Sequence, residues 1–349
     1  MLLLHNKIEK IVHSLTIFVT MSNEVGKGEV GSCIIMGAGA WGTAMSVHLA
    51  KNGLSTVLVP WDEAEAQAIK EHGNRLGVEL PPNIRIDTHF ERYVQPTSVV
   101  FLACRVQGLR TACERLKAHE AKLKDVISLM KGLDEETFQT PTQIIQTLLP
   151  NVNAMCLTGP TIAKEFAEGK PAAMLLASQL ERRNLQKAFS SETVRIYYGN
   201  DVTGAELGGS LKNIYAIGIG VLDGLELGNN ARAAYLTRAV KEMIDIGVCL
   251  GGRRETFYGL SGLGDLFTTA RAGRSHHFGF AFAQGQSPET LLKEATVEGY
   301  ASIHRFHERL KERNLDTPIL DGLHAVFYEN TPIMDVIHRF MSRPLRDET

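Results

Sequence analysis

The sequence predicts an α/β domain built on a parallel sheet, followed by a domain that is entirely helical. Three observations support this prediction. Short apolar runs alternate with helical segments over the first two hundred residues, which is the order of a β-α-β fold. A glycine-rich turn joins the first of these runs to a helix. After Asp201 the β-branched runs stop, and apolar residues recur every three or four positions as in amphipathic helices.

The first β-α-β unit begins at Ser32. The strand-like run SCIIM is followed by GAGAWG, by the helical stretch TAMSVHLAKNG, which ends at Gly53, and by a second strand-like run, STVLVP. Further runs have the length and composition of buried parallel strands, and the last of them can close the sheet: SVVFLAC (98–104), DVISLM (125–130), NAMCLTG (153–159), AAMLLAS (172–178) and VRIYYG (194–199).

The helical domain is expected to begin near residue 203. From Gly204 onward, apolar residues follow in steps of three or four and define one helix face. A second helix with the same periodicity follows Asn230, and the two asparagines there can serve as N-caps. The chain therefore divides into a leader of undetermined structure and two domains: 1–30, 31–203 and 204–349.

Composition excludes several classes of function. The 349 residues include 37 basic and 39 acidic side chains, with no lysine and arginine block of the kind that binds nucleic acid. The apolar run LTIFVT, at residues 15–20, is too short for membrane insertion, and charged residues precede it. The five cysteines contain no C-x-x-C pair and are expected to be free thiols in a reducing cytoplasm.

The glycine-rich turn has the G-x-G-x-x-G pattern of a dinucleotide site, formed by Gly37, Gly39 and Gly42 around Ala40 and Trp41. The first glycine allows the tight turn, the second lets a pyrophosphate approach the backbone, and the third lets the helix pack closely on the strand. Because a strand precedes the motif and a helix follows it, we expect a Rossmann-type nucleotide-binding domain.

Asp62 suggests which dinucleotide binds. It lies twenty residues beyond Gly42, at the end of the second predicted strand, where a carboxylate can accept hydrogen bonds from the adenosine ribose. The same carboxylate would repel a 2′-phosphate, so NAD is expected in preference to NADP. The alternative is a solvated aspartate at the acidic start of a helix, PWDEAE.

A series of segments along the chain carries a resemblance to a known family. They are GAGAWGTA (37–44), NRLGVELPPNI (74–84), VQGLR (106–110), MKGLD (130–134), TGPTIAKE (158–165), AELGGSLKNIYAIGIG (205–220), GNNARAA (228–234), GLGDLFTT (262–269) and VEG (297–299). In this order they resemble the NAD(P)-dependent glycerol-3-phosphate dehydrogenases, particularly the bacterial type. The resemblance implies a C-terminal domain like that of 6-phosphogluconate dehydrogenase, and an active site in a cleft between the domains.

The resemblance implies a reaction centre of two lysines and an aspartate. Lys212, in LKN, matches the catalytic lysine that donates a proton to the developing alkoxide in reduction and accepts it in oxidation. Lys131, in MKG, would bind substrate and help to lower the pKa of Lys212. Asp265, in GLGDL, would bind the substrate hydroxyl and orient the lysine. Each residue also has an alternative role. Lys212 could be a surface lysine beside the buried stripe, and Lys131 a solvated lysine at a strand end. Asp265 could be a helix N-cap.

The resemblance also implies further contacts. The guanidinium of Arg274 suits the substrate phosphate, while Ser275 stands where the family has asparagine and reaches less far. The other residues expected to bind substrate are Gly159, Thr161, Asn213 and Gly273. The dinucleotide is expected to contact Lys131 and Arg274 as well as Ala40, Trp41, Ala163 and Glu298. For Trp41 the alternative is packing, and for Glu298 it is a helix start.

No metal site is expected from the sequence. The neighbouring His276 and His277 face different ways, and His304 and His307 form an i, i+3 pair without a nearby third ligand at the usual spacing. Reduction of a ketone by hydride needs no metal where a lysine polarises the carbonyl.

The expected activity is reversible hydride transfer between NAD(P)H and dihydroxyacetone phosphate, giving sn-glycerol 3-phosphate for glycerophospholipid synthesis. The resemblance suggests a homodimer. One alternative is a dehydrogenase that acts on a hydroxy acid. Another is a non-catalytic module that senses the NADH/NAD ratio, although such a module has no use for an acid–base lysine.

Overall fold

The computed structural model describes residues 30–345 and 347. The leader expected over residues 1–30 therefore lies, apart from Val30, outside the described residues. Within the described part of the chain, no helix combines the length and the apolar character needed to cross a membrane.

The described residues form two compact units. Unit 1 contains most of the first two hundred residues: those up to Met130, Thr142–Leu157 and Thr161–Asn200. Unit 2 contains the helical part of the chain and two short segments that precede it: Lys131–Pro141, Thr158–Pro160 and the residues from Asp201 onward.

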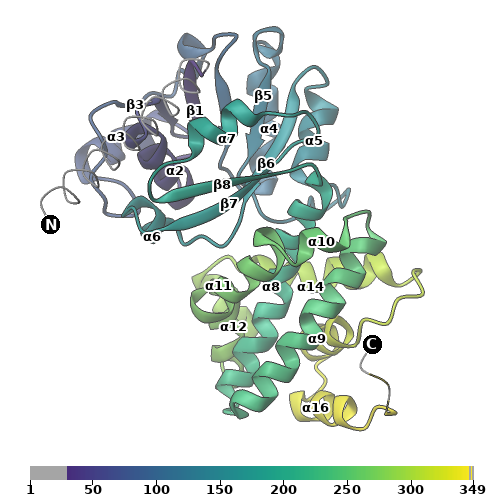
Figure 1. Ribbon diagram of the computed structural model, residues 1–349. Coiled ribbons are helices and arrows are strands. Elements are labelled where there is room, and N and C mark those ends of the chain that lie inside the picture. The colour runs from purple at the N-terminus through teal and green to yellow at the C-terminus, as the bar shows by residue number, and fades with distance from the viewer. Residues whose placement is uncertain (1–29, 346, 348–349) are drawn as a thin grey trace, which may run out of the picture. The chain divides into compact units, whose positions relative to one another are not determined.

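Unit 1 is built on an eight-stranded sheet (Figure 1). In spatial order the strands are β3 (Ile84–Ile86), β2 (Ser55–Val59), β1 (Ser32–Met36), β4 (Val99–Leu102), β5 (Asp125–Ser128), β6 (Asn153–Thr158), β7 (Ala172–Ala177) and β8 (Val194–Gly199). The pairs β3–β2, β2–β1, β1–β4, β4–β5, β5–β6 and β7–β8 are parallel. The strand order reverses between β1 and β4, and open α/β sheets bind ligands outside the carboxyl ends of the strands at such a point.

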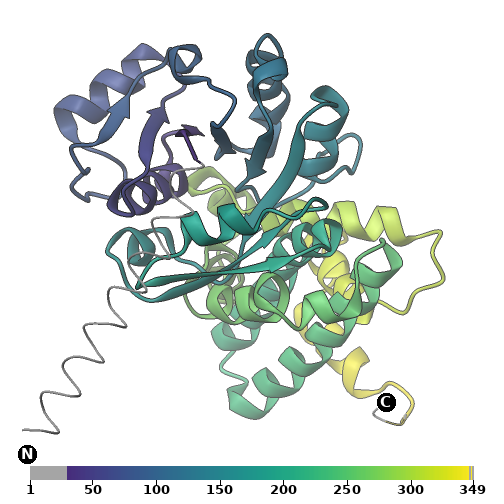
Figure 2. The same cartoon turned by 45° about the horizontal axis from the view of Figure 1, so that its top comes forward.

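Helices cover both faces of this sheet, as the two views in Figures 1 and 2 show. They are α2 (Ala40–Lys51), α3 (Glu63–His72), α4 (Leu109–Lys117), α5 (Pro141–Leu148), α6 (Ala163–Ala167) and α7 (Arg183–Phe189). Alternate residues of β1 enter two different cores: Cys33 and Ile35 pack with α2, whereas Ile34 and Met36 pack with α4. Both faces are therefore apolar, which explains the continuous apolar runs in the sequence.

All the runs predicted as strands form strands, and VRIYYG closes one edge of the sheet as β8. The sequence pattern does not show β3. This strand has three residues at the other edge of the sheet, none of them buried, so it carries no apolar run that could indicate it.

Unit 2 is helical. Its elements are α8 (Val202–Gly224), α9 (Gly228–Cys249), α10 (Arg254–Phe257), the π-helical turn η4 (Leu260–Gly264), α11 (Asp265–Ala272), α12 (Arg274–Ala283), α13 (Pro288–Glu294), α14 (Glu298–Leu310), α15 (Pro318–Tyr328) and α16 (Ile333–Met341). Helix α8 is the centre of the unit and contacts α9, α11, α12 and α14. Figure 1 shows it in teal and green among these helices.

The expectation that α8 buries a single face is wrong, because nearly its whole surface is buried. Its glycines explain the difference. A Cβ on Gly220 would lie 2.0 Å from the carbonyl oxygen of His276, and one on Gly218 would lie 1.9 Å from the hydroxyl oxygen of Tyr235. Gly218 lies on the predicted apolar face, four residues after Ile214, but Gly220 does not, so neighbouring chain also touches α8 on a side that the apolar pattern does not mark.

The prediction that asparagines cap the second long helix is also wrong. Helix α9 begins at Gly228, so Asn229 and Asn230 lie in its first turn, and the N-cap residue is Leu227, which makes no side-chain capping hydrogen bond. The tight connection from α8 starts this helix earlier than the asparagines indicate.

Candidate active site

The glycine-rich loop after β1 leaves open space at one position. Gly37 has φ +113°, and a Cβ there would lie 2.8 Å from the carbonyl oxygen of Ala103, just beyond β4. A Cβ on Gly42 would lie 1.9 Å from the carbonyl oxygen of Gly37. At Gly39, by contrast, a Cβ would meet nothing within 4 Å. Gly37 and Gly42 thus let the chain pack closely, whereas Gly39 borders a space that suits a pyrophosphate.

Helix α2 adds a second feature that suits an anion. Its N-cap is Gly39, which makes no side-chain capping bond, and the first backbone bond of the helix runs from Thr43 N to Gly39 O. The N–H groups of the first turn, including those of Ala40 and Trp41, therefore have no helical acceptor. Such a helix N-terminus binds phosphate well, so this loop fits a dinucleotide.

Two residues expected to contact the dinucleotide pack within unit 1. The rings of Trp41 and Phe166 lie 5.1 Å apart at 57°, and Ala163 begins the short helix α6 in the same apolar cluster. Trp41 therefore has the packing role that the sequence left open.

Asp62 is the N-cap of α3. It is exposed, it lies three residues beyond β2, and its Oδ1 accepts a hydrogen bond from Glu65 N at 2.8 Å. This is the alternative role considered from the sequence. A capping carboxylate still has a second oxygen, and its position after β2 is the one that contacts ribose in dinucleotide-binding folds.

Within unit 2, a lysine on the buried helix α8 meets an aspartate at the start of α11. Lys212 is 5% exposed and Asp265 is 1% exposed. Lys212 Nζ donates to Asp265 Oδ1 at 2.8 Å and to Thr269 Oγ1 at 2.6 Å. Asp265 is not the N-cap of α11, a position held by Gly264, so its carboxylate faces the lysine instead of the helix end.

Lys131 completes this group. It belongs to unit 2 and forms an ion pair with Asp265 Oδ2, and its Nζ also donates to the carbonyl of Gly159 at 3.2 Å. Its side chain is 20% exposed, so its ammonium is more accessible than that of Lys212. One carboxylate thus lies between two ammonium groups, and with both lysines protonated the group carries a net charge of +1.

The pKa of Lys212 is lowered to about 8. Burial is the main cause because it disfavours the charged ammonium, and the positive charge of Lys131 acts in the same direction. The Asp265 carboxylate opposes both effects through its charge and its hydrogen bond. Lys212 can therefore exchange a proton near neutral pH, as a general acid–base requires.

Sequence reasoning did not identify Thr269, the second partner of Lys212. A signal was present, because Thr269 follows Asp265 by four residues in GLGDLFTT and positions four apart share a helix face. Thr158 was also missed. Its hydroxyl is buried and without a hydrogen-bond partner, and it lies where a Cβ on Gly209 would be 3.4 Å away.

Asn213 and Glu298 meet in unit 2. Asn213 is 7% exposed, and its Nδ2 donates to Gly209 O and to Glu298 Oε2, each at 3.5 Å. Glu298 is exposed at the first position of α14, the helix-start position considered from the sequence.

Arg274 lies apart from these hydrogen bonds. It begins α12, is exposed, and donates from Nη1 to Thr296 O at 3.2 Å. Ser275 follows it but is only 4% exposed, so its hydroxyl is largely covered. Gly273 is the N-cap of α12 and accepts from His277 N.

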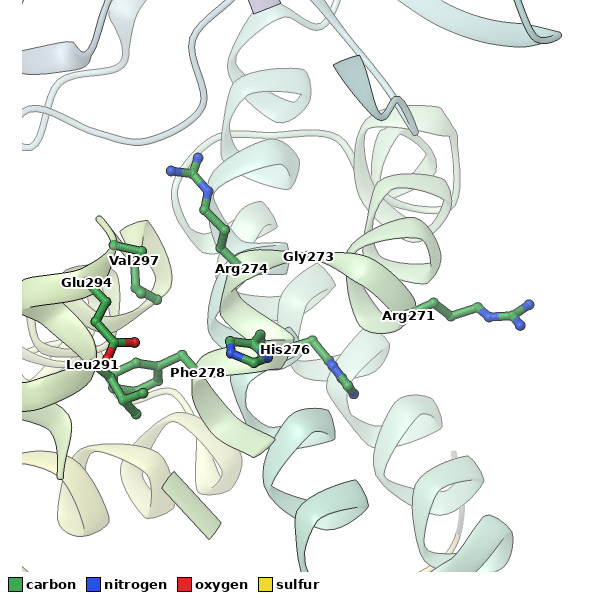
Figure 3. Close-up of a pocket in the computed structure, with 10 residues that line it drawn as sticks. Arg271, Gly273, Arg274, His276, Phe278, Leu291, Glu294 and Val297 are labelled. Carbon is green, nitrogen blue, oxygen red and sulfur yellow. The ribbon is translucent and has the colours of Figure 1, made fainter. Parts of the chain in front are cut away.

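Residues around Arg274 line a surface pocket of about 360 Å³ that does not include Lys212 or Asp265 (Figure 3). The side chain of Arg274 points away from Glu294 and His276 in this view. The remaining predicted residue, Thr161, is half-buried in the connection between β6 and α6.

Comparison with known proteins covers most of the chain. Two family models match. Residues 32–184 match the one described as the NAD-dependent glycerol-3-phosphate dehydrogenase N-terminus, and residues 201–338 match the one described as the NAD-dependent glycerol-3-phosphate dehydrogenase C-terminus. A glycerol-3-phosphate dehydrogenase [NAD(P)+] of Salinibacter ruber is 33% identical over 91% of this chain and 97% of its own length. Another glycerol-3-phosphate dehydrogenase [NAD(P)+], from Herminiimonas arsenicoxydans, is 35% identical over 90% of this chain and 98% of its own length. A solved structure of a glycerol-3-phosphate dehydrogenase from Coxiella burnetii has a TM-score of 0.82 at 26% identity, covering 90% of this chain and all of that one.

Proposed function

This chain belongs to the NAD-dependent glycerol-3-phosphate dehydrogenase family, and we propose that it interconverts dihydroxyacetone phosphate and sn-glycerol 3-phosphate. The observation that carries this proposal is the group in unit 2 in which Asp265 binds both Lys131 and Lys212. A buried lysine whose pKa is lowered toward neutrality is suited to move a proton to or from a substrate oxygen.

The residues of this group divide the chemistry between them. NAD or NADP supplies or accepts the hydride when bound. In reduction, Lys212 Nζ donates a proton to the C2 oxygen of the ketone, and in oxidation it takes the proton from the C2 hydroxyl. Asp265 and Thr269 hold the lysine in place. Lys131 stabilises negative charge on the substrate oxygen and favours the neutral form of Lys212.

We assign the substrate phosphate to Arg274 and the start of α12. A guanidinium binds a phosphate through two parallel hydrogen bonds. Because the Ser275 hydroxyl is largely covered, we propose that it adds little, and that backbone N–H groups of the first turn of α12 contribute instead. Asn213, Gly159 and Thr161 are proposed to line the same substrate site.

We propose NAD as the preferred cofactor because Asp62 is exposed just beyond β2. Kinetics with NADH and NADPH test this preference directly. Asp62→Asn should narrow the difference between the two KM values, and a lower KM for NADPH in the unaltered protein would contradict the assignment. We further propose a homodimer in the cytoplasm that supplies glycerophospholipid synthesis, and light scattering tests its assembly.

The direct test of the activity is oxidation of NADH by purified protein with dihydroxyacetone phosphate. We expect turnover, and we expect Lys212→Ala to lower kcat by roughly 10²–10⁴-fold while NADH still binds. Lys241→Ala is a matched control, because Lys241 is also a lysine of unit 2 bound to an aspartate but is exposed.

The same assay separates the alternatives. Dihydroxyacetone without its phosphate should be a poor substrate because it lacks the group that Arg274 binds. Activity on hydroxy acids in place of the triose phosphate would move the assignment to another dehydrogenase. NADH binding without turnover of any of these compounds would favour a sensor.

A further inference from the structure

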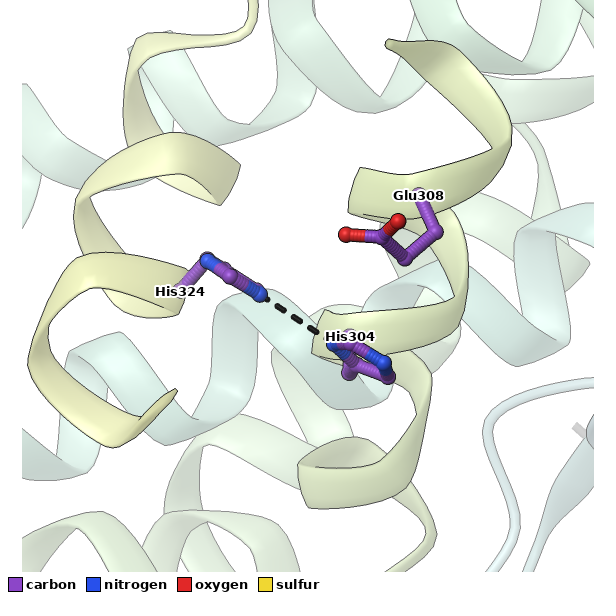
Figure 4. A group of neighbouring side chains, drawn as sticks. All are labelled: His304, Glu308 and His324. Atoms are coloured by element: carbon purple, nitrogen blue, oxygen red, sulfur yellow. Dashed lines mark hydrogen bonds between the residues drawn. The ribbon is translucent and has the colours of Figure 1, made fainter. Parts of the chain in front are cut away.

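Three potential metal ligands converge where α14 packs on α15 (Figure 4). His304 and Glu308 lie one turn apart on α14, and His324 comes from α15. One ligand atom from each of the three lies within 4.8 Å of the others. Spacing of i, i+4 places two ligands on one helix face, and the facing helix supplies the third.

The two histidine nitrogens already have a separation that suits a bound metal. His304 Nδ1 and His324 Nε2 lie 3.2 Å apart. In a tetrahedral zinc site each nitrogen is about 2.0–2.1 Å from the ion, so two ligand nitrogens are separated by about 3.3 Å. The two nitrogens can therefore bind one ion at about their present separation, once the exposed His304 ring turns so that both lone pairs point at it.

His324 is oriented by a carboxylate. Its Nδ1 lies 3.0 Å from Glu329 Oε1, and because an ionised carboxylate only accepts, Nδ1 carries the hydrogen. The lone pair of Nε2 then faces His304. Metal-binding histidines usually have such a partner on their other nitrogen, which fixes the tautomer and the ring.

The ring of His324 is also held by stacking. His307 stacks on it at 3.8 Å and 12°, and Tyr328 stacks on it at 5.2 Å and 11°. His324 itself is buried, whereas His304 and Glu308 are exposed. One ligand is thus rigid and two face solvent, which leaves a path for an ion and room for a water molecule as fourth ligand.

We propose that His304, Glu308 and His324 form a binding site for a divalent transition metal, with zinc as the ion that this donor set favours. The ion would link α14 to α15 and have a structural role. Binding displaces the proton shared by the histidines and competes with the ion pair between Glu308 and Lys311. This proposal replaces the sequence-based expectation that the chain binds no metal.

The test starts from the full chain, treated with a chelator and then freed of it. Zinc chloride is titrated into this protein at pH 7.5, and isothermal titration calorimetry measures the binding. We expect His304→Ala and Glu308→Gln each to abolish one equivalent of bound zinc. His338→Ala and Glu312→Gln are matched controls at exposed positions and should keep it. The two altered ligands are exposed, so folding should be retained, and circular dichroism checks this.

Two further measurements separate a built site from casual binding. Glu329→Gln leaves all three ligands in place but removes the charge behind His324, so zinc affinity should fall by about 10–100-fold. Cobalt(II) should give the visible absorption of a tetrahedral ion in the unaltered protein and lose it in His304→Ala.

Zinc should also raise the melting temperature of the unaltered protein but not that of His304→Ala, because a ligand that binds only the folded state stabilises it. The kcat of these variants should be unchanged, since none of the three ligands belongs to the Lys212 group. Equal zinc binding by the unaltered protein and both ligand variants, or no binding by any of them, would overturn the proposal.

Discussion

Asp265 accepts a hydrogen bond from the buried ammonium of Lys212 at 2.8 Å, and it is the carboxylate that also pairs with Lys131. Asp265 and Lys131 therefore act on the pKa of Lys212 in opposite directions. Asp265 favours the charged form of Lys212, whereas Lys131 favours the neutral form. The acid–base behaviour of the enzyme should therefore depend on a balance that single substitutions can shift either way.

The first prediction concerns the pH dependence of the unaltered protein. Because the pKa of Lys212 is lowered to about 8, kcat/KM for reduction should fall above that pH, where the lysine has lost the proton it donates. For oxidation, kcat/KM should rise over the same range. Steady-state kinetics between pH 7 and 10 check this, since the substrate phosphate, with a pKa of about 6, stays dianionic. Profiles that are flat through pH 8 in both directions would remove Lys212 as the titrating group.

Lys131→Gln should move this profile to higher pH. Removing the neighbouring positive charge takes away an effect that lowers the pKa of Lys212. We also expect kcat to fall, because Lys131 no longer stabilises the substrate oxygen. Lys241→Gln is the matched control and should leave the profile in place. A shift to lower pH would contradict the proposed electrostatics even if activity fell.

Two glycines of the dinucleotide loop should respond differently to alanine. In Gly42→Ala the new Cβ would meet the carbonyl oxygen of Gly37 at 1.9 Å, so we expect a loss of about 1–3 kcal/mol in stability. Gly39→Ala places its Cβ in open space, so the melting temperature should be unchanged while the KM for NADH rises.

Gly108→Ala serves as a control for this pair, because its Cβ would have only an ordinary contact at 3.8 Å with Cys104. This substitution should change neither the stability of the protein nor its KM for NADH. If Gly39→Ala bound NADH as tightly as the unaltered protein, the open space beside Gly39 would not be the pyrophosphate site.

A buried carboxylate away from the proposed site should control the stability of unit 2. Glu242 is 4% exposed and accepts hydrogen bonds from Ile319 N at 2.8 Å and Leu320 N at 2.9 Å, at the start of α15. Glu242→Ala leaves these donors without an acceptor, so the free energy of unfolding should fall by about 2–5 kcal/mol. Urea unfolding followed by circular dichroism measures this, with the exposed Glu255→Ala as control.

The free energy of unfolding that Glu242→Ala removes should also depend on pH. Burial raises the pKa of Glu242 from 4.5 to about 7. Because the folded-state pKa lies above the unfolded-state value, this group's contribution to stability is full below pH 4.5 and is lost as the pH rises through 7. Glu242→Ala should therefore cost more stability at pH 5 than at pH 8. An equal loss at both would mean that the folded protein does not hold this proton.

Much of the fold was predictable from the sequence because its signals are local. Strands buried on both faces require continuous apolar runs, and all the runs predicted as strands form them. Gly42 in the dinucleotide loop is required by its contact with Gly37, five residues earlier in the chain. Strand β3 could not be predicted, because a three-residue edge strand with no buried residue leaves no pattern.

The proposed site was predictable only as a set of residues. The motifs named Lys131, Lys212 and Asp265, but their burial and hydrogen bonds depend on chain segments far apart in sequence. Lys131 and Gly159 lie among the strands of unit 1 in the sequence, yet they pack in unit 2 beside Asp265. No periodicity reports such long-range packing.

The histidines of the proposed metal site also come together only in the tertiary structure. Sequence spacing offered His304 no third ligand, because His324 is twenty residues away on another helix. By itself the sequence determined the strands that carry apolar runs and the glycine-rich turn, because both depend on local side-chain chemistry and steric requirements. Through its motifs it also supplied the residues of the proposed reaction centre. Only the tertiary structure decided that α8 is buried on all sides, that one aspartate lies between two lysines, and that two helices bring His304 to His324, because these contacts exist only after distant segments pack together.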